Sequence, residues 1–146
     1  MATYTIPQQD VGLGIPARTT DTINAILTPI LLGDDPDVVS QSFEVAASQT
    51  LAALTVVGLD ANGRIVAATW NATPASRIDP IGVLCEAITT DSSTNYKGAL
   101  VWVSGHFNYD RLVWDGTFST DAQKYTVLQK RIGVIKATKI KSGTPA

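Results

Sequence analysis

The sequence has few charged residues, and this shortage limits the partners that the protein can bind. Charged residues make up 16 % of the 146-residue chain, against about 25 % in an average globular domain. The surface must therefore be covered by Thr, Ser, Gln and Asn or by another protein. The net charge is −2, and no cluster of Lys and Arg occurs before residue 124. Nucleic-acid binding requires a basic stripe that displaces counterions from phosphates, so we expect no nucleic-acid partner.

Histidine, cysteine and glutamate are also scarce, which argues against the common kinds of catalytic and metal site. His106 and Cys85 are the single residues of their types, and Glu44 and Glu86 are the only glutamates. One cysteine cannot form an intramolecular disulfide, and its apolar surroundings favour a small buried thiol over a Cys–His dyad. A structural zinc site needs four nitrogen or sulfur ligands. We therefore expect no enzyme activity, no metal and no cofactor.

Long apolar runs and export signals are missing as well. No apolar stretch approaches the roughly 18 residues that a membrane helix requires. The N-terminus has neither a basic region nor an apolar core typical of a secretory signal. We expect no membrane partner, and we expect synthesis and assembly in a cytoplasm.

What is present predicts a mainly β (α+β) chain with one short helix. Asn62-Gly63, between two apolar runs, is typical of a hairpin turn. A helix is expected from Ser119 or Thr120 to about Arg131, because a capping residue precedes an apolar stripe. The expected strands cover most of 42–59, then 64–70, 81–90, 98–107 and 132–140, and the expected stripe is Ala122, Tyr125, Leu128 and Ile132.

The first 24 residues differ in character from the rest of the chain. They contain Pro7, Gly12, Gly14 and Pro16, which interrupt both helix and sheet. Within them, Thr3, Tyr4, Thr5 and Ile6 alternate like a strand. Residues 1–24 are therefore interpreted either as a flexible tail or as an arm that adds a strand to a partner's sheet. Residues 25–146 are expected to form a single β-rich domain.

The tryptophans leave two interpretations open. Trp70, Trp102 and Trp114 could together provide a platform on which sugars stack. Residues of this type are more often anchors of a core or of a subunit interface.

A series of short segments occurs in a fixed order and spacing along the chain. They are a Thr-Pro step within Leu27–Leu32, then Arg64–Ala67, Ile81–Leu84, Ser104–Phe107 leading into Asp110–Trp114, a short helix with Asp121 and Lys124, and a closing strand from Ile132. In this order and spacing the chain resembles the lambda-type bacteriophage head decoration proteins, although each piece is weak by itself. The resemblance covers slightly more than half of the chain, and residues 34–59 form an insertion relative to the short lambda-type form.

The resemblance implies a compact β-barrel or sandwich-like domain with an extended N-terminal arm and no enzymatic activity. It implies a homotrimer that binds the major capsid protein at three-fold and quasi-three-fold positions of the expanded head. Such a trimer lies on the outer capsid surface of the virion and stabilises the head against DNA pressure. We expect the arm residues Thr3, Tyr4, Thr5 and Ile6 to pair with the capsid. We further expect the trimer to be supported by Pro29, Leu31, Phe107 and Trp114.

Two other functions remain alternatives at this stage. One is a carbohydrate- or receptor-binding β module of a phage virion, which the tryptophans would serve. The other is a small β-barrel enzyme, which would require a cleft that joins Glu86 or His106 to further polar groups.

Overall fold

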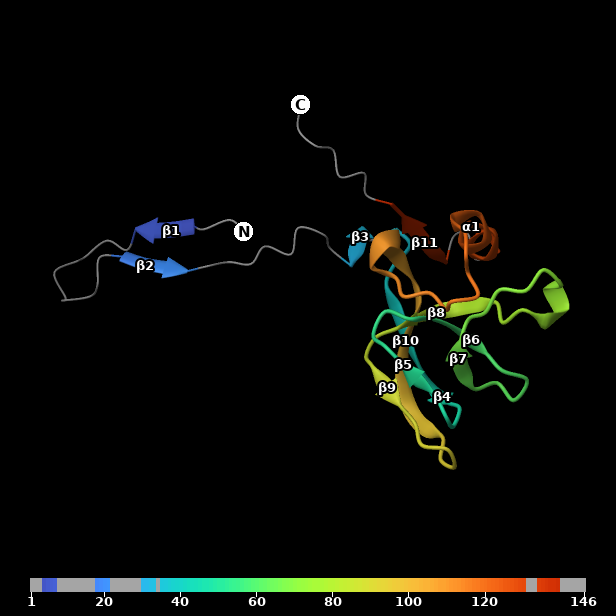
Figure 1. The fold of residues 1–146 in the computed structure, drawn as a ribbon. Coiled ribbons are helices and arrows are strands. Elements are labelled where there is room, and N and C mark those ends of the chain that lie inside the picture. The colour runs from blue at the N-terminus through green and yellow to red at the C-terminus, as the bar shows by residue number, and fades with distance from the viewer. Residues whose placement is uncertain (1–3, 8–17, 22–29, 34, 131–133, 140–146) are drawn as a thin grey trace.

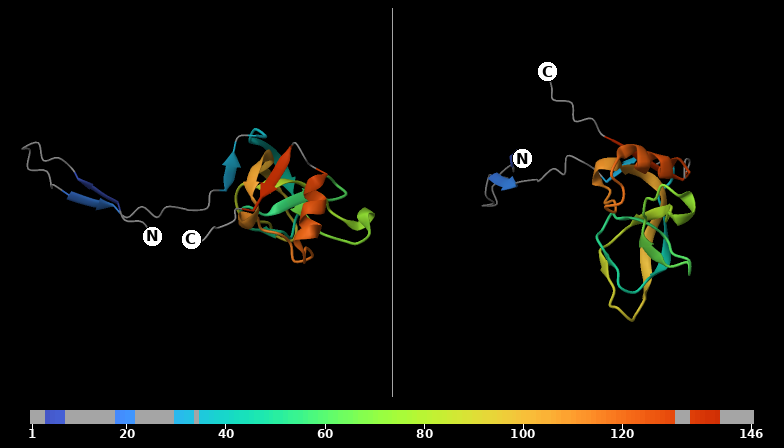
Figure 2. Two further views of the ribbon diagram at one scale, coloured as in Figure 1. Left: turned by 90° about the horizontal axis from the view of Figure 1, so that it is seen from above. Right: turned by 45° about the vertical axis from the view of Figure 1, so that its right-hand side comes forward.

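One long strand, β10 (Tyr96–Asn108), takes part in two sheets and connects the two halves of the domain. The computed structural model describes residues 4–7, 18–21, 30–33, 35–130 and 134–139. Within these residues the protein is mainly β with one α-helix, α1, which confirms the predicted fold class. Figure 1 shows α1, β3 and β11 gathered at one end of the domain, and the connection between β9 and β10 at the other. Figure 2 shows the same arrangement from two further directions.

Most of the elements are consecutive strands, and the described residues contain one β–α–β unit, β10–α1–β11, whose two strands are parallel. The strands are β1 (Tyr4–Pro7), β2 (Arg18–Asp21), β3 (Leu31–Gly33), β4 (Val39–Val45), β5 (Thr50–Leu51), β6 (Val56–Leu59), β7 (Ile65–Ala67), β8 (Pro80–Leu84), β9 (Ile88–Thr89), β10 and β11 (Ile135–Thr138). The helices are α1 (Asp121–Gln129) and two short 3₁₀ turns, η1 (Pro74–Ser76) and η2 (Tyr109–Arg111).

Five strands close into a small barrel, as the resemblance implied. β10 pairs with β4, β4 with β7, β7 with β6, β6 with β8, and β8 pairs again with β10. A closed ring of strands has no free edge. Its core is a cluster of mainly aliphatic side chains, to which β5 and β9 add one residue each. The members are Val45, Leu51, Val57, Ile65, Leu84, Ile88, Ala99 and Val101.

The last residues of β10 extend beyond the barrel and form a second, three-stranded sheet with β3 and β11. Its residues Gly105–Asn108 pair in parallel with β11, while His106 and Phe107 pair in antiparallel fashion with β3 on the other side. Helix α1 packs on this sheet over a second core. That core contains Val56, Ala68, Val83, Phe107, Leu112, Phe118, Val127, Leu128 and Ile135.

Gly105 allows β10 to serve both sheets. Its φ angle is +150°, and the pairing with β4 shifts in register just before it, between Trp102 and Ser104. The shift places Phe107 on the same side as Trp102, and their ring centroids lie 5.9 Å apart. Phe107 thereby enters the second core rather than the barrel.

The predicted hairpin at Asn62-Gly63 is present. β6 and β7 are antiparallel, and the amide of Gly63 donates to the carbonyl oxygen of Asp60. Within this loop only Gly63 has a positive φ, +76°, which is typical of a three-residue loop with a glycine bulge. The carboxylate of Asp60 accepts hydrogen bonds from the backbone of Asn62 and Arg64 and from the Arg64 guanidinium.

Two local predictions need correction. The strand expected over most of 42–59 is divided into β4, β5 and β6, because Ser48 and Leu54 have φ angles of +59° and +66° and interrupt it. Helix α1 begins after Thr120, whose side chain forms a capping box with Gln123, but it ends at Gln129.

The expected stripe of α1 also differs from the observed one. Val127 and Leu128 are its buried residues, whereas Ala122 and Tyr125 are exposed. The helix has only two and a half turns, so its last turn makes the core contact. Ile132 lies outside the described residues.

Candidate functional site

The predicted capsid-binding segment is a strand that already has a partner. Tyr4, Thr5 and Ile6 lie on β1, which pairs with β2 in antiparallel fashion, while Thr3 lies outside the described residues. The sequence did not indicate β2 as that partner. In a two-stranded sheet each strand keeps one edge, and neither has a further strand partner in the part of the chain that is described. Such an edge can accept another strand, and pairing with the capsid remains a prediction.

The four residues expected to support the trimer occupy different environments. Leu31, on β3, is half-buried and packs against the second core. Phe107 is fully buried within a single chain, so any effect on a trimer would act through the position of β10. Trp114 is half-buried beside the same core. Pro29 lies outside the described residues, and the role of all four in a trimer remains a prediction.

Aromatic rings cluster between the end of β10 and α1. Tyr109, in η2, stacks on Tyr125 of α1 with a centroid distance of 5.0 Å. Trp114 meets Phe118 edge to face at 4.9 Å and lies 6.2 Å from Tyr109. Asn108 holds this corner in place, because its side-chain oxygen accepts a hydrogen bond from the amide of Asp110 at 3.1 Å.

An ionic chain of three groups runs along the aromatic cluster. The Tyr109 hydroxyl donates to Oδ1 of Asp121 at 2.7 Å, and Nζ of Lys139 donates to Oδ2 at 2.6 Å. Lys139 also lies 5.1 Å from the centroid of the Tyr109 ring, within the range of a cation–π contact. The chain joins η2, α1 and the residue that follows β11.

The three groups shift one another's pKa in consistent directions. Burial of the Tyr109 side chain raises its pKa far above the usual range, and the hydrogen bond to Asp121 adds to this. The hydrogen bond from Lys139 lowers the pKa of Asp121, with a further contribution from Tyr109. The same bond to Asp121 raises the pKa of Lys139. The arrangement stabilises a protonated tyrosine beside an ion pair, which is a structural role and not one of proton transfer near neutral pH.

One buried polar atom near this cluster has no hydrogen-bond partner among the described residues. Nε1 of Trp114 is buried and makes no hydrogen bond to the described residues. A buried unpaired donor costs about 1–3 kcal/mol.

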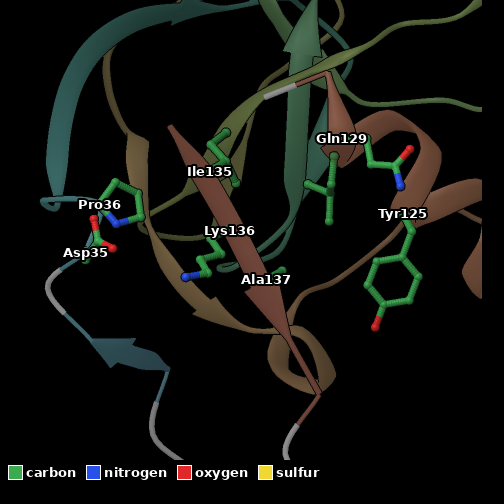
Figure 3. Close-up of a pocket in the computed structure, with 8 residues that line it drawn as sticks. Asp35, Pro36, Tyr125, Gln129, Ile135, Lys136 and Ala137 are labelled. Carbon is green, nitrogen blue, oxygen red and sulfur yellow. The ribbon is translucent and has the colours of Figure 1, made fainter. Parts of the chain in front are cut away.

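A groove of about 420 Å³ lies along β11. Figure 3 shows β11 running between the Asp35–Pro36 turn on one side and α1 on the other. The lining is largely apolar and comes from three parts of the chain. It consists of Asp35, Pro36, Tyr125, Leu128, Gln129, Ile135, Lys136 and Ala137. Nothing in the sequence signalled this groove, because it depends on the parallel return of β11 beside β10.

Cys85 and His106 do not form a dyad. The amide of Cys85 donates to the carbonyl of Leu100 on β10. His106 is six residues further along that strand, a separation of about 20 Å. Its Nε2 instead lies 2.9 Å from the hydroxyl of Thr138. Burial raises the pKa of the Cys85 thiol, which makes it less nucleophilic at neutral pH.

The other sequence-derived candidates for chemistry are equally separate. Glu86 is exposed, and Glu44 accepts a hydrogen bond from the Asn95 amide at 2.8 Å. No group of three or more His, Cys, Asp or Glu side chains among the described residues is arranged to hold a metal ion. The part of the chain that is described also contains no helix with the length and apolar character to cross a membrane.

The three tryptophans do not form one platform. Each is partly buried and packs against the second core. Arg77 covers the ring of Trp70 at 3.7 Å from its centroid, Phe107 lies against Trp102, and Phe118 against Trp114. Their arrangement corresponds to the interpretation as core anchors.

The barrel, the smaller sheet with α1 and the N-terminal strand pair define a mainly β protein. The chain matches the family model described as "Bacteriophage lambda head decoration protein D" over residues 22–132. Because the match covers most of the chain, the protein belongs to this family, and the resemblance found in the sequence is confirmed. The family implies binding to a phage capsid and a place on the capsid surface. None of the curated proteins matches the chain.

Proposed function

We propose that this protein binds the outer surface of the expanded phage head as a homotrimer at three-fold and quasi-three-fold positions. There it stabilises the shell against DNA pressure, acting through binding and without catalysis, a cofactor, nucleic acid or a membrane. Its partner is the major capsid protein, and it is made in the host cytoplasm before it joins the virion. The observation that carries this proposal is the family match over residues 22–132.

The physical basis is binding linkage. A ligand that binds only the expanded lattice stabilises that lattice in proportion to the logarithm of its concentration over its Kd. A trimer presents three arms at once, so its avidity can exceed the affinity of a single arm by orders of magnitude. Weak strand additions by Tyr4, Thr5 and Ile6 of each arm, together with Thr3, are then sufficient for stable decoration.

The arm is proposed to act through backbone pairing. β1 alternates as a strand, and β1 and β2 each keep one edge without a strand partner among the described residues. Backbone hydrogen bonds supply affinity in strand addition, and side chains supply specificity. A capsid strand beside β1 would therefore bind with little demand on charge, which suits a sequence with few charged residues.

The test is co-sedimentation of the protein with expanded and unexpanded capsids from its own source. The full chain and a variant that lacks residues 1–24 are compared. We expect the full chain to sediment with expanded heads only, and the truncated chain to remain in the supernatant. Equal sedimentation of both chains would contradict the role of the arm, and no binding of the full chain to either capsid form would contradict decoration itself.

A carbohydrate- or receptor-binding module is the second candidate. The packing of Trp70, Trp102 and Trp114 against the core disfavours it, because a sugar-stacking site needs an open ring face. Quenching of tryptophan fluorescence by a glycan would support this candidate instead.

A further inference from the structure

The groove along β11 combines two features that an added extended segment requires. β11 ends its sheet, and its outer edge has no strand partner among the described residues. Such an edge presents unpaired N–H and C=O groups. The groove beside it is walled by Tyr125 and Leu128 of α1 and by Pro36, with Ile135 and Ala137 of β11 in its lining. Backbone pairing and apolar contacts are therefore available together, as in strand addition.

We propose that residues 22–29 of a second copy of this chain lie in this groove, along the edge of β11. The inference rests on the proposed function, because it identifies the contact that holds the trimer together. In a head-to-tail ring of three chains, each groove receives one segment, and the interface closes on itself.

The composition of the segment matches the lining of the groove. Residues 22–29 read Thr-Ile-Asn-Ala-Ile-Leu-Thr-Pro and carry no charge. Ile26 and Leu27 are their adjacent large apolar residues, and the groove offers leucine, isoleucine, alanine and tyrosine side chains to cover them.

The segment enters the described fold at the end of the sheet where β11 finishes. The carbonyl of Ile30, which follows the segment directly, accepts a hydrogen bond from the amide of Asn108 at 2.8 Å. Asn108 is the register partner of Thr138, the last residue of β11. Ile30, the residue that follows the segment, therefore lies near the end of β11.

The same chain is a poor donor for its own groove. β3 and β11 lie on opposite sides of β10, so the segment would have to cross three strand spacings, about 14 Å. That crossing uses at least four extended residues. These four residues would be 26–29. Ile26 and Leu27 would then lie on the crossing path and could not enter the groove of their own chain. A neighbouring chain can place the whole segment alongside β11.

The test is photo-crosslinking from position 27. Benzoylphenylalanine replaces Leu27, and equal amounts of unlabelled and nitrogen-15-labelled chains are refolded together, irradiated and analysed by mass spectrometry. We expect crosslinks to the peptides that carry Tyr125–Gln129 or Ile135–Ala137, with about half of them joining a labelled to an unlabelled chain. Benzoylphenylalanine in place of Leu100, an exposed residue of the barrel part of β10, is the control and should not reach these peptides.

A pair of matched charge substitutions gives an independent readout. Leu27→Asp should reduce the molar mass measured by light scattering from that of a trimer to that of a monomer, whereas Leu100→Asp should leave the trimer intact. Wild-type protein that is monomeric would overturn this inference together with the trimer of the proposed function. A wild-type trimer whose crosslinks join only chains of the same label, or map outside the groove, would overturn this inference alone.

Discussion

At the scale of single residues, Gly105 shows how one backbone position sets the course of a strand. Its φ of +150° lies in a region that side chains rarely adopt, and an added Cβ would lie 3.0 Å from the ring of Phe107. The residue stands where β10 passes from the barrel to the smaller sheet. Both cores therefore depend on the absence of a side chain at this position.

We expect Gly105→Ala to lower the free energy of unfolding by about 2 kcal/mol, because backbone strain and crowding of Phe107 add. Two other glycines separate these causes. Gly98→Ala tests φ alone, since Gly98 has a φ of +95° and no neighbour within 4 Å of an added Cβ. Gly116→Ala introduces neither backbone strain nor crowding, because Gly116 has no neighbour within 4 Å of an added Cβ. Its free energy of unfolding should stay within about 0.5 kcal/mol of the wild-type value. Denaturant unfolding gives the three values, and equal stability of Gly105→Ala and Gly116→Ala would contradict the explanation.

At the scale of elements, the sequence predicted what local chemistry determines. The glycine of the loop between β6 and β7, the Thr120 cap of α1 and the mainly β class all follow from residue types at fixed spacings. The loop glycine and the helix cap depend on four residues or fewer, so they can be recognised in an isolated segment.

The sequence could not predict which distant segments pair with one another. β8 crosses β10 so closely that an added Cβ at Gly82 would lie 2.5 Å from the carbonyl oxygen of Trp102. The alternation within β8 and β10 does not specify this partner. The parallel pairing of β10 with β11 and the Tyr109–Asp121–Lys139 chain likewise join segments that lie well apart in sequence. The groove arises from the same long-range pairing, so it too could only be seen in the structure.

The Tyr109–Asp121–Lys139 chain predicts a loss of stability at alkaline pH. Folding raises the pKa of Tyr109 above its ordinary 10.0 and that of Lys139 above its ordinary 10.5. Between the unfolded and folded values the unfolded chain binds fewer protons, so the free energy of unfolding falls as the pH rises above about 10. The stabilisation from these two groups is fully present below that pH.

Tyr109→Phe should make this alkaline fall less steep and should cost about 1 kcal/mol at neutral pH through the lost hydrogen bond. Denaturant unfolding at several pH values between neutrality and pH 11 measures both effects. Tyr96→Phe, which removes the hydroxyl of an exposed tyrosine, is the matched control. An alkaline slope shared by Tyr109→Phe and the wild type would contradict the assignment.

At the scale of the whole molecule, stability and assembly are assigned to different parts of the chain. Both core clusters, with the partly buried side chains that pack against them, lie between Leu31 and Ala137. β1 and β2 pair with each other. We have proposed that residues 1–24 bind the capsid and that the segment ending at Pro29 joins neighbouring copies.

Nested truncations should therefore remove the two kinds of assembly one after the other. A chain that starts at Ala25 keeps Ile26 and Leu27, so it should remain a trimer by light scattering while it no longer sediments with expanded heads. A chain that starts at Ile30 should be monomeric as well. Because both chains retain the two cores, far-UV circular dichroism should show the same sheet content in both. The Tm of the trimeric chain should rise with its concentration, whereas that of the monomeric chain should not. Loss of the trimer already at Ala25 would show that residues before Ala25 are required for the subunit contact, and a trimer that survives in the chain starting at Ile30 would place the contact on the barrel domain.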